Sequence, residues 1–145
     1  YAYLNINGNS YDVDYQVAGR EKEYQMNIYA PKVVQHKGRT TSQIVVNFFM
    51  GSADDKVEYR IGDGEWTPMR HFQGVDPSYN LKLVEWDLAE ELLPGRRPSN
   101  AVTSSHLWRG TVRLDLPPGT HVIEVRATDR YGKTHEGKRS YTILE

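Results

Sequence analysis

The stretch that decides the fold is residues 56–69, KVEYRIGDGEWTPM. Two short runs of alternating apolar and polar residues flank Gly62-Asp63-Gly64. An Asp-Gly pair supplies the positive backbone angles that a hairpin turn needs. The sequence therefore predicts a β-hairpin with strands over 56–61 and 64–69.

Working outward from this hairpin, residues 43–50, QIVVNFFM, are almost continuously apolar. A short run of this kind is typical of a central strand that is covered on both faces. Other runs alternate at a spacing of two, which is typical of a strand with one packed face and one wet face. These further strands are expected around Tyr3–Ile6, Tyr11–Val17, Gln25–Ala30, Trp108–Leu116, Ile123–Ala127 and Tyr141–Ile143, and Lys32–Thr41 is expected to be a connecting loop.

About seven short strands separated by turn signals predict a mostly β fold. We expect an immunoglobulin-like or fibronectin III-like antiparallel β-sandwich with one short helix in a crossover. The residues predicted to contribute to its core are Ile44, Val46, Phe48, Ile123, Val125 and Tyr141.

One segment has helical periodicity. After Asp76-Pro77, a favourable cap and first turn, leucine and valine recur at steps of three to four residues at positions 81, 84, 88 and 92. Pro94-Gly95 is expected to end this helix. Residues 96–105 then form an aperiodic loop that is long for a compact domain, and such loops often carry function.

The bulk composition fits one domain spanning residues 1–145. A net charge of -1 offers no overall field to attract nucleic acid. There is no cysteine, and no apolar run approaches the roughly 20 residues of a spanning helix. Because the chain starts at Tyr1, without an initiator Met and inside an alternating pattern, we expect that it was excised from a longer protein.

Catalytic motifs are missing from the chain. Its five histidines form no H-x-H or H-E-x-x-H pair, and there is no G-x-S-x-G elbow or phosphate-binding glycine loop. The carboxylate pairs Asp54-Asp55 and Glu90-Glu91 are interpreted as solvated charge. We therefore predict no catalytic residue, no metal ligand and no cofactor in this domain, which is not expected to be an enzyme by itself.

The most unusual stretch runs from Trp66 to Arg109 and mixes arginines with aromatic rings, a composition enriched at protein interfaces. In the alternative interpretation the tryptophans are core residues and the arginines only cover them. The candidates for an interface or a substrate cleft are Arg70, Asp76, Tyr79, Arg96, Arg97, His106, Trp108 and Arg109.

Several ordered motifs resemble one family. They are VEYRIGDGEWTPM (57–69), DPSY (76–79), GRRPSN (95–100), SSHLWRG (104–110) and LPPGTHVIEVRATDRYGKT (116–134). Together they resemble the C-terminal domain of bacterial calcineurin-like phosphoesterases, strongly over residues 42–143 and, through DYQVAGREKEYQMNIYAP (14–31), more weakly to the start of the chain. The resemblance implies an accessory β-sandwich that follows a metallophosphoesterase domain, and a parent hydrolase that is exported to the periplasm or the cell exterior.

That catalytic domain would bind two divalent metals through D-x-H, G-D-x-x-D, G-N-H-[DE] and G-H-x-H motifs, none of which occurs in this chain. The expected partner is therefore the phosphoesterase domain of the same polypeptide, with no nucleic acid and no membrane span. We expect the loop and helix to dock on that domain and to border its substrate cleft. The alternatives are an independent carbohydrate- or surface-binding module, for which aromatic rings should line one flat face, and an enzyme built on Asp76, His106 and Arg109.

Overall fold

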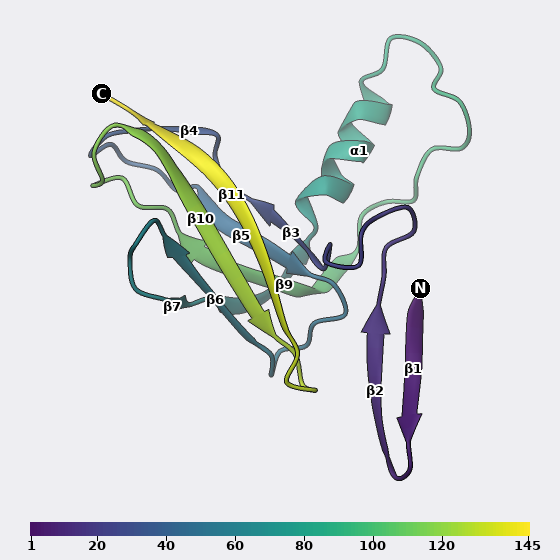
Figure 1. Ribbon diagram of the computed structural model, residues 1–145. Helices are drawn as coiled ribbons and strands as arrows, with labels where there is room; N and C mark the ends of the chain where they lie inside the picture. The colour runs from purple at the N-terminus through teal and green to yellow at the C-terminus, as the bar shows by residue number, and fades with distance from the viewer.

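The computed structural model describes residues 1–145 as eleven strands and one helix (Figure 1). The elements are β1 (Ala2–Asn7), β2 (Ser10–Tyr15), β3 (Met26–Tyr29), β4 (Val33–Gln35), β5 (Gln43–Phe48), β6 (Lys56–Ile61), β7 (Thr67–Pro68), β8 (Arg70–Val75), α1 (Pro77–Asp87), β9 (Thr103–Thr111), β10 (Gly119–Thr128) and β11 (Thr134–Leu144).

Two sheets form the body of the molecule. One has the strand order β4-β11-β10-β6-β7, and the other has the order β3-β5-β9-β8. All neighbouring strands are antiparallel except β4 and β11, which are parallel. The predicted antiparallel sandwich is confirmed. The loop expected over Lys32–Thr41 contains β4, which is too short to show an alternating pattern.

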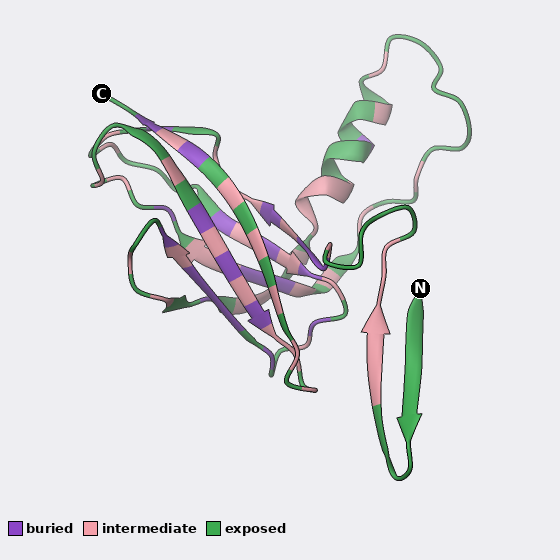
Figure 2. Ribbon diagram, in the orientation of Figure 1, coloured by how far each residue is buried: buried purple, intermediate pink, exposed green.

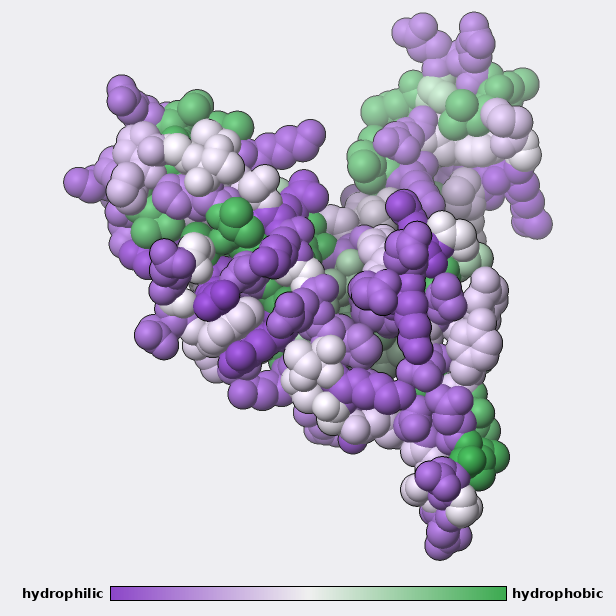
Figure 3. Space-filling model, viewed as in Figure 1, coloured by the Kyte–Doolittle hydropathy of each residue, from purple (hydrophilic) through white to green (hydrophobic).

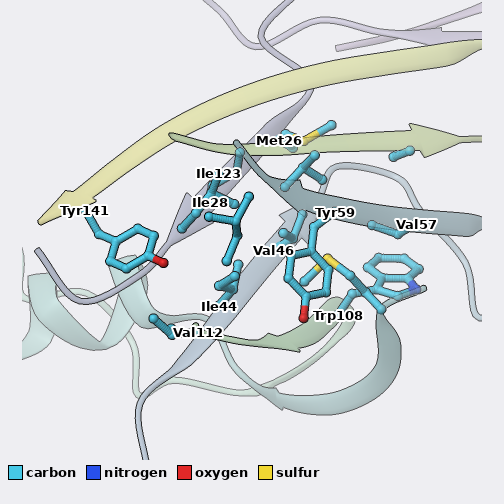
Figure 4. Close-up of a cluster of buried hydrophobic side chains, with 14 of the residues drawn as sticks. Met26, Ile28, Ile44, Val46, Val57, Tyr59, Trp108, Val112, Ile123 and Tyr141 are labelled. Atoms are coloured by element: carbon cyan, nitrogen blue, oxygen red, sulfur yellow. The ribbon is translucent and has the colours of Figure 1, made fainter. Parts of the chain in front are cut away.

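A single cluster of 17 buried residues fills the space between the sheets (Figure 4). It includes all six predicted core residues, none of which is more than 3% exposed. Inward-facing residues alternate with outward-facing ones along β5, where Ile44, Val46 and Phe48 are buried. The residues between them are only half-buried, so β5 is fully covered on one face and not on both.

The hairpin after β6 is present, but its second strand is shorter than predicted. Only Thr67 and Pro68 pair with β6, through Tyr59 and Glu58. Gly62 adopts a φ of 55° and donates its backbone N–H to Val122 of β10. The Trp66 ring lies beneath the guanidinium groups of Arg60 and Arg126, at 4.8 and 4.2 Å. Residues 64–66, which include Trp66, therefore lie outside the ladder between β6 and β7.

Two elements stand away from the sandwich, on the same side of it in Figure 1. One is the β1–β2 hairpin, which forms a separate two-stranded sheet. The other, which we call the insertion, comprises α1 and the loop to β9, residues 76–102. Figure 2 shows that both are largely exposed, whereas the buried residues are concentrated in the sandwich.

Candidate functional site

The insertion begins at a well-formed helix cap. The Asp76 side chain accepts hydrogen bonds from the backbone N–H groups of Ser78 and Tyr79, at 2.8 and 3.0 Å, and from the Ser78 hydroxyl at 2.5 Å. Pro77 occupies the first turn. The start of the helix is therefore as predicted, because the signals that specify it are local in sequence.

The same carboxylate joins the helix to the sheet. Asn47 of β5 donates from Nδ2 to Asp76 Oδ2 at 2.6 Å, and the Tyr29 hydroxyl of β3 lies 3.3 Å from both carboxylate oxygens. Burial acts to raise the pKa of Asp76, but hydrogen bonds from Ser78 and Asn47 outweigh it and lower the pKa. Burial raises the pKa of Tyr29, and the Asp76 charge adds to that effect. Asp76 thus stays ionised and fixes where the insertion leaves the sheet.

The loop after the helix folds back on it. The Arg97 guanidinium donates to both carboxylate oxygens of Asp87, at 2.6 and 2.7 Å, and lowers the pKa of Asp87. The Tyr79 hydroxyl donates to the carbonyl of Ser99 at 2.8 Å. The candidates Tyr79 and Arg97 therefore hold the loop in shape, and Arg96 is exposed beside them.

The surface of the insertion is unexpectedly apolar. The helix ends at Asp87, before the predicted Pro94-Gly95, and only Leu83 on it is buried. Leu88 is 76% exposed and Leu92 fully exposed. The other exposed apolar side chains of the insertion are Leu81, Val84, Leu93 and Val102. Figure 3 shows hydrophobic residues gathered over the helix and its loop. The leucines and the valine that set the helical period are thus exposed on the outside of the insertion.

Two other candidates lie on the outer face of the β3-β5-β9-β8 sheet. Arg70 of β8 and Arg109 of β9 are direct cross-strand partners. Because Trp108 faces the core, its neighbour Arg109 points to the opposite face. The Arg109 guanidinium lies 5.2 Å from the centre of the Phe72 ring. Neither arginine forms an ion pair, and Arg109 Nε is buried without a hydrogen-bond partner.

The remaining two candidates face inward. Trp108 is 1% exposed and packs against Phe48 and His71. His106 lies two residues earlier on the same face of β9, with Nδ1 2.5 Å from the carbonyl oxygen of Gly51. The sandwich core holds the Trp108 ring, so we remove it from the candidate surface. His106 is likewise separated from the arginines by the sheet.

A pocket of about 360 Å³ lies between the β1–β2 hairpin and the sandwich. Its wall includes Tyr15 from β2, Phe49 and Asp55 from the segment after β5, Tyr131 from the β10–β11 turn and His135 from β11. Among its carboxylates, Asp14 is paired with Lys133, and Asp129 accepts the backbone N–H groups of Tyr131 and Lys133. Sequence reasoning missed this pocket because its walls come from segments that only folding brings together.

Comparison with protein families finds one matching model, described as the C terminal of calcineurin-like phosphoesterase, over residues 1–135. The chain belongs to this family. The match covers the β1–β2 hairpin, the insertion and every strand except β11, and it confirms the resemblance seen in the motifs. A search of curated proteins gives no match.

The catalytic domains of calcineurin-like phosphoesterases are implied to bind metals, so the C-terminal domain was compared with the ligands that such metals need. No group of three or more His, Cys, Asp or Glu side chains lies close enough together to hold a metal ion. The residues present here therefore do not fit the metals that the family implies. No helix has the length and apolar character needed to cross a membrane.

Proposed function

We propose that this domain is a non-catalytic accessory domain that docks on the calcineurin-like phosphoesterase domain of the same polypeptide through its insertion, at the border of the substrate cleft. The phosphate chemistry and the two divalent metals would belong to that catalytic domain. Following the family resemblance, we place the protein in the periplasm or outside the cell.

The apolar outer face of the insertion is the observation that carries this proposal. Leu81, Val84, Leu88, Leu92, Leu93 and Val102 are exposed on a segment of 27 residues, 76–102. Contiguous apolar surface rimmed by polar groups is typical of an interaction site. The Arg97–Asp87 and Tyr79–Ser99 contacts hold the insertion in shape, so less ordering entropy is lost when a partner binds.

The arrangement of aromatic rings supports protein docking over carbohydrate binding. Trp108 is buried, and Trp66 is covered by two arginines. Among the exposed rings, Tyr1 and Tyr3 are 77° from coplanar and Tyr11 is 65° from coplanar with Tyr131, so neither pair forms a flat platform. Titrating polysaccharides against the 145-residue chain tests this alternative; saturable binding that depended on Tyr1 or Tyr3 would favour the carbohydrate module.

The test of docking is amide hydrogen exchange of the insertion in the complete phosphoesterase and in the 145-residue chain alone. We expect residues 88–102 to exchange more slowly in the complete protein. Leu88→Asp with Leu92→Asp should remove that protection and leave the melting temperature of the isolated chain unchanged, because both side chains are exposed.

The matched control is Val33→Asp with Leu144→Asp, two exposed apolar residues at the other end of the sandwich. This pair should leave the protection of residues 88–102 intact. Equal exchange of the insertion in both contexts would show that it does not dock.

A further inference from the structure

We infer that Arg70 and Arg109 form a binding site for a carboxylate, supplied by an aspartate or glutamate side chain of the docked phosphoesterase domain. This inference rests on the proposed function and adds the chemistry of the partner surface. The two guanidinium groups would share the incoming carboxylate on the outer face of the β3-β5-β9-β8 sheet.

The arginine pair places two positive charges next to each other on the sheet. Arg70 and Arg109 are directly opposite each other on neighbouring strands. Like charges at such positions destabilise a sheet. No carboxylate lies within ion-pair distance of either side chain, and neither guanidinium makes a hydrogen bond within the chain.

The other sheet provides an internal comparison. On its outer face, Glu58 accepts from Arg126 and Lys56, and Glu124 accepts from Arg60 and Lys138. Each cation there has a glutamate within 3.0 Å. On this outer face, each glutamate therefore lies between two cations and pairs with both of them. Arg70 and Arg109 also lie on the outer face of a sheet but have no such acid, and this missing charge points to a partner.

The surroundings of the pair favour a forked, planar acceptor. Phe72 lies beneath Arg109 and limits the orientations of its guanidinium. An arginine held in this way donates two parallel hydrogen bonds to a carboxylate, as Arg97 does to Asp87 within this chain.

The location matches the docking surface. β8 leads directly into the insertion, since Val75 is followed by the cap residue Asp76. Asn47, on the outer face of β5, donates to Asp76, so the base of the insertion and the arginine pair share one face of the sheet. A partner that covers both the insertion and this face of the sheet would contact the two arginines.

The test is Arg70→Glu, which places a carboxylate opposite Arg109 within the chain itself. We expect the melting temperature of the 145-residue chain to rise, because the repulsion is replaced by a cross-strand ion pair. In the complete protein we expect strands β8 and β9 to lose their docking protection in hydrogen exchange, because the internal acid occupies the site. A fall in the melting temperature would overturn the inference.

Arg130→Glu is the matched control, because Arg130 is an exposed arginine without an ion pair in the β10–β11 turn. Arg130→Glu should not raise the melting temperature of the 145-residue chain, and it should not remove the protection of β8 and β9 in the complete protein. Equal effects of the two variants would overturn the inference. If residues 88–102 are protected from exchange in the complete protein but Arg70→Glu does not change the protection of β8 and β9, the carboxylate site is refuted and docking is not. If residues 88–102 are not protected in the complete protein, docking itself is refuted.

Inorganic phosphate added to the isolated chain distinguishes the source of the anion. Saturable protection of β8 and β9 by phosphate alone would identify a phosphorylated ligand and overturn the partner carboxylate. We expect no saturable effect.

Discussion

At the scale of single residues, Asp76 has the largest structural role among the candidates. Its carboxylate caps α1 and also holds Asn47 and Tyr29 on two strands of the sheet. A side chain that was singled out for recognition therefore fixes the orientation of the surface that we propose for docking. Its direct contact with a partner is not needed for this role.

Asp76→Ala should lower the free energy of unfolding by about 2 kcal/mol, since a lost N-cap alone costs about 1 kcal/mol and Asn47 would lose its acceptor. Asp76→Asn should cost less, because asparagine is also a good cap. Urea denaturation of the 145-residue chain measures both. Equal losses for the two variants would show that the charge, and not the cap, is what matters.

At the scale of elements, the β1–β2 hairpin is attached by few contacts. Lys133 donates to Asp12 and Asp14 at 2.7 and 2.8 Å, which raises the pKa of Lys133. Tyr15 packs edge-on against Phe49. A two-stranded hairpin is marginal by itself, so these contacts decide its position.

Lys133→Met should free the hairpin from the sandwich. We expect amides of residues 2–15 to exchange faster, with little change in the exchange of β5 and β10, whose core contacts do not involve Lys133. Asp63→Asn is a control that removes a charge from an exposed turn elsewhere. Unchanged exchange in the hairpin would show that its other contacts hold it, such as Tyr15 on Phe49 and the hydrogen bond from Gln25 Nε2 to the Tyr15 carbonyl.

The paired charges on the outer face of the β4-β11-β10-β6-β7 sheet predict a pH dependence. Burial acts to raise the pKa of Glu58, but Arg126 and Lys56 outweigh it; Lys138 and Arg60 lower the pKa of Glu124. A carboxylate with a depressed folded-state pKa stabilises the fold above its unfolded pKa of about 4.5, and this stability is lost as the pH falls through the folded value.

Thermal unfolding of the 145-residue chain should therefore show a melting temperature that falls below a pH of about 4.5. Glu58→Gln should flatten that fall, because glutamine has no proton to gain. A melting temperature equally dependent on pH in the variant would assign the effect to other carboxylates, such as Asp76.

At the scale of the whole molecule, the two sheets differ in how the charges on their outer faces are paired, and the two sides of the domain differ in which elements extend from them. On the outer face of one sheet, Glu58 and Glu124 each pair with two cations, whereas the other sheet carries the unpaired arginines. The insertion and the hairpin both extend on one side of the sandwich (Figure 1). This asymmetry is what a domain with one docking side would need.

Docking through both an apolar insertion and an arginine pair should depend partly on salt. Raising the ionic strength should weaken the protection of β8 and β9 more than that of residues 88–102, because ionic contacts are screened and apolar burial is not. Hydrogen exchange of the complete protein at two salt concentrations measures this. Equal weakening of both segments would argue against an ionic contact at the arginines.

Local patterns in the sequence determined most of the strands, the core and the start of the helix, but they did not predict β4 or β8 and placed the start of β9 at Trp108 instead of Thr103. Alternation at a spacing of two identifies core positions such as Ile44 and Ile123 because a strand has only two faces. The Asp76-Pro77 cap acts within one helical turn. The ordered motifs in turns and strands were enough to identify the family.

The tertiary structure decided which faces meet. The periodicity of Leu81, Val84 and Leu88 predicts a helix but not whether its apolar face is covered, since that depends on a neighbouring surface. The alternation along β9 separates Trp108 from Arg109, but only the pairing of β9 with β5 and β8 shows that the tryptophan faces the core and that Arg109 meets Arg70. The pocket beneath the hairpin and the unpaired arginines arise from contacts between residues distant in sequence, which no local pattern encodes.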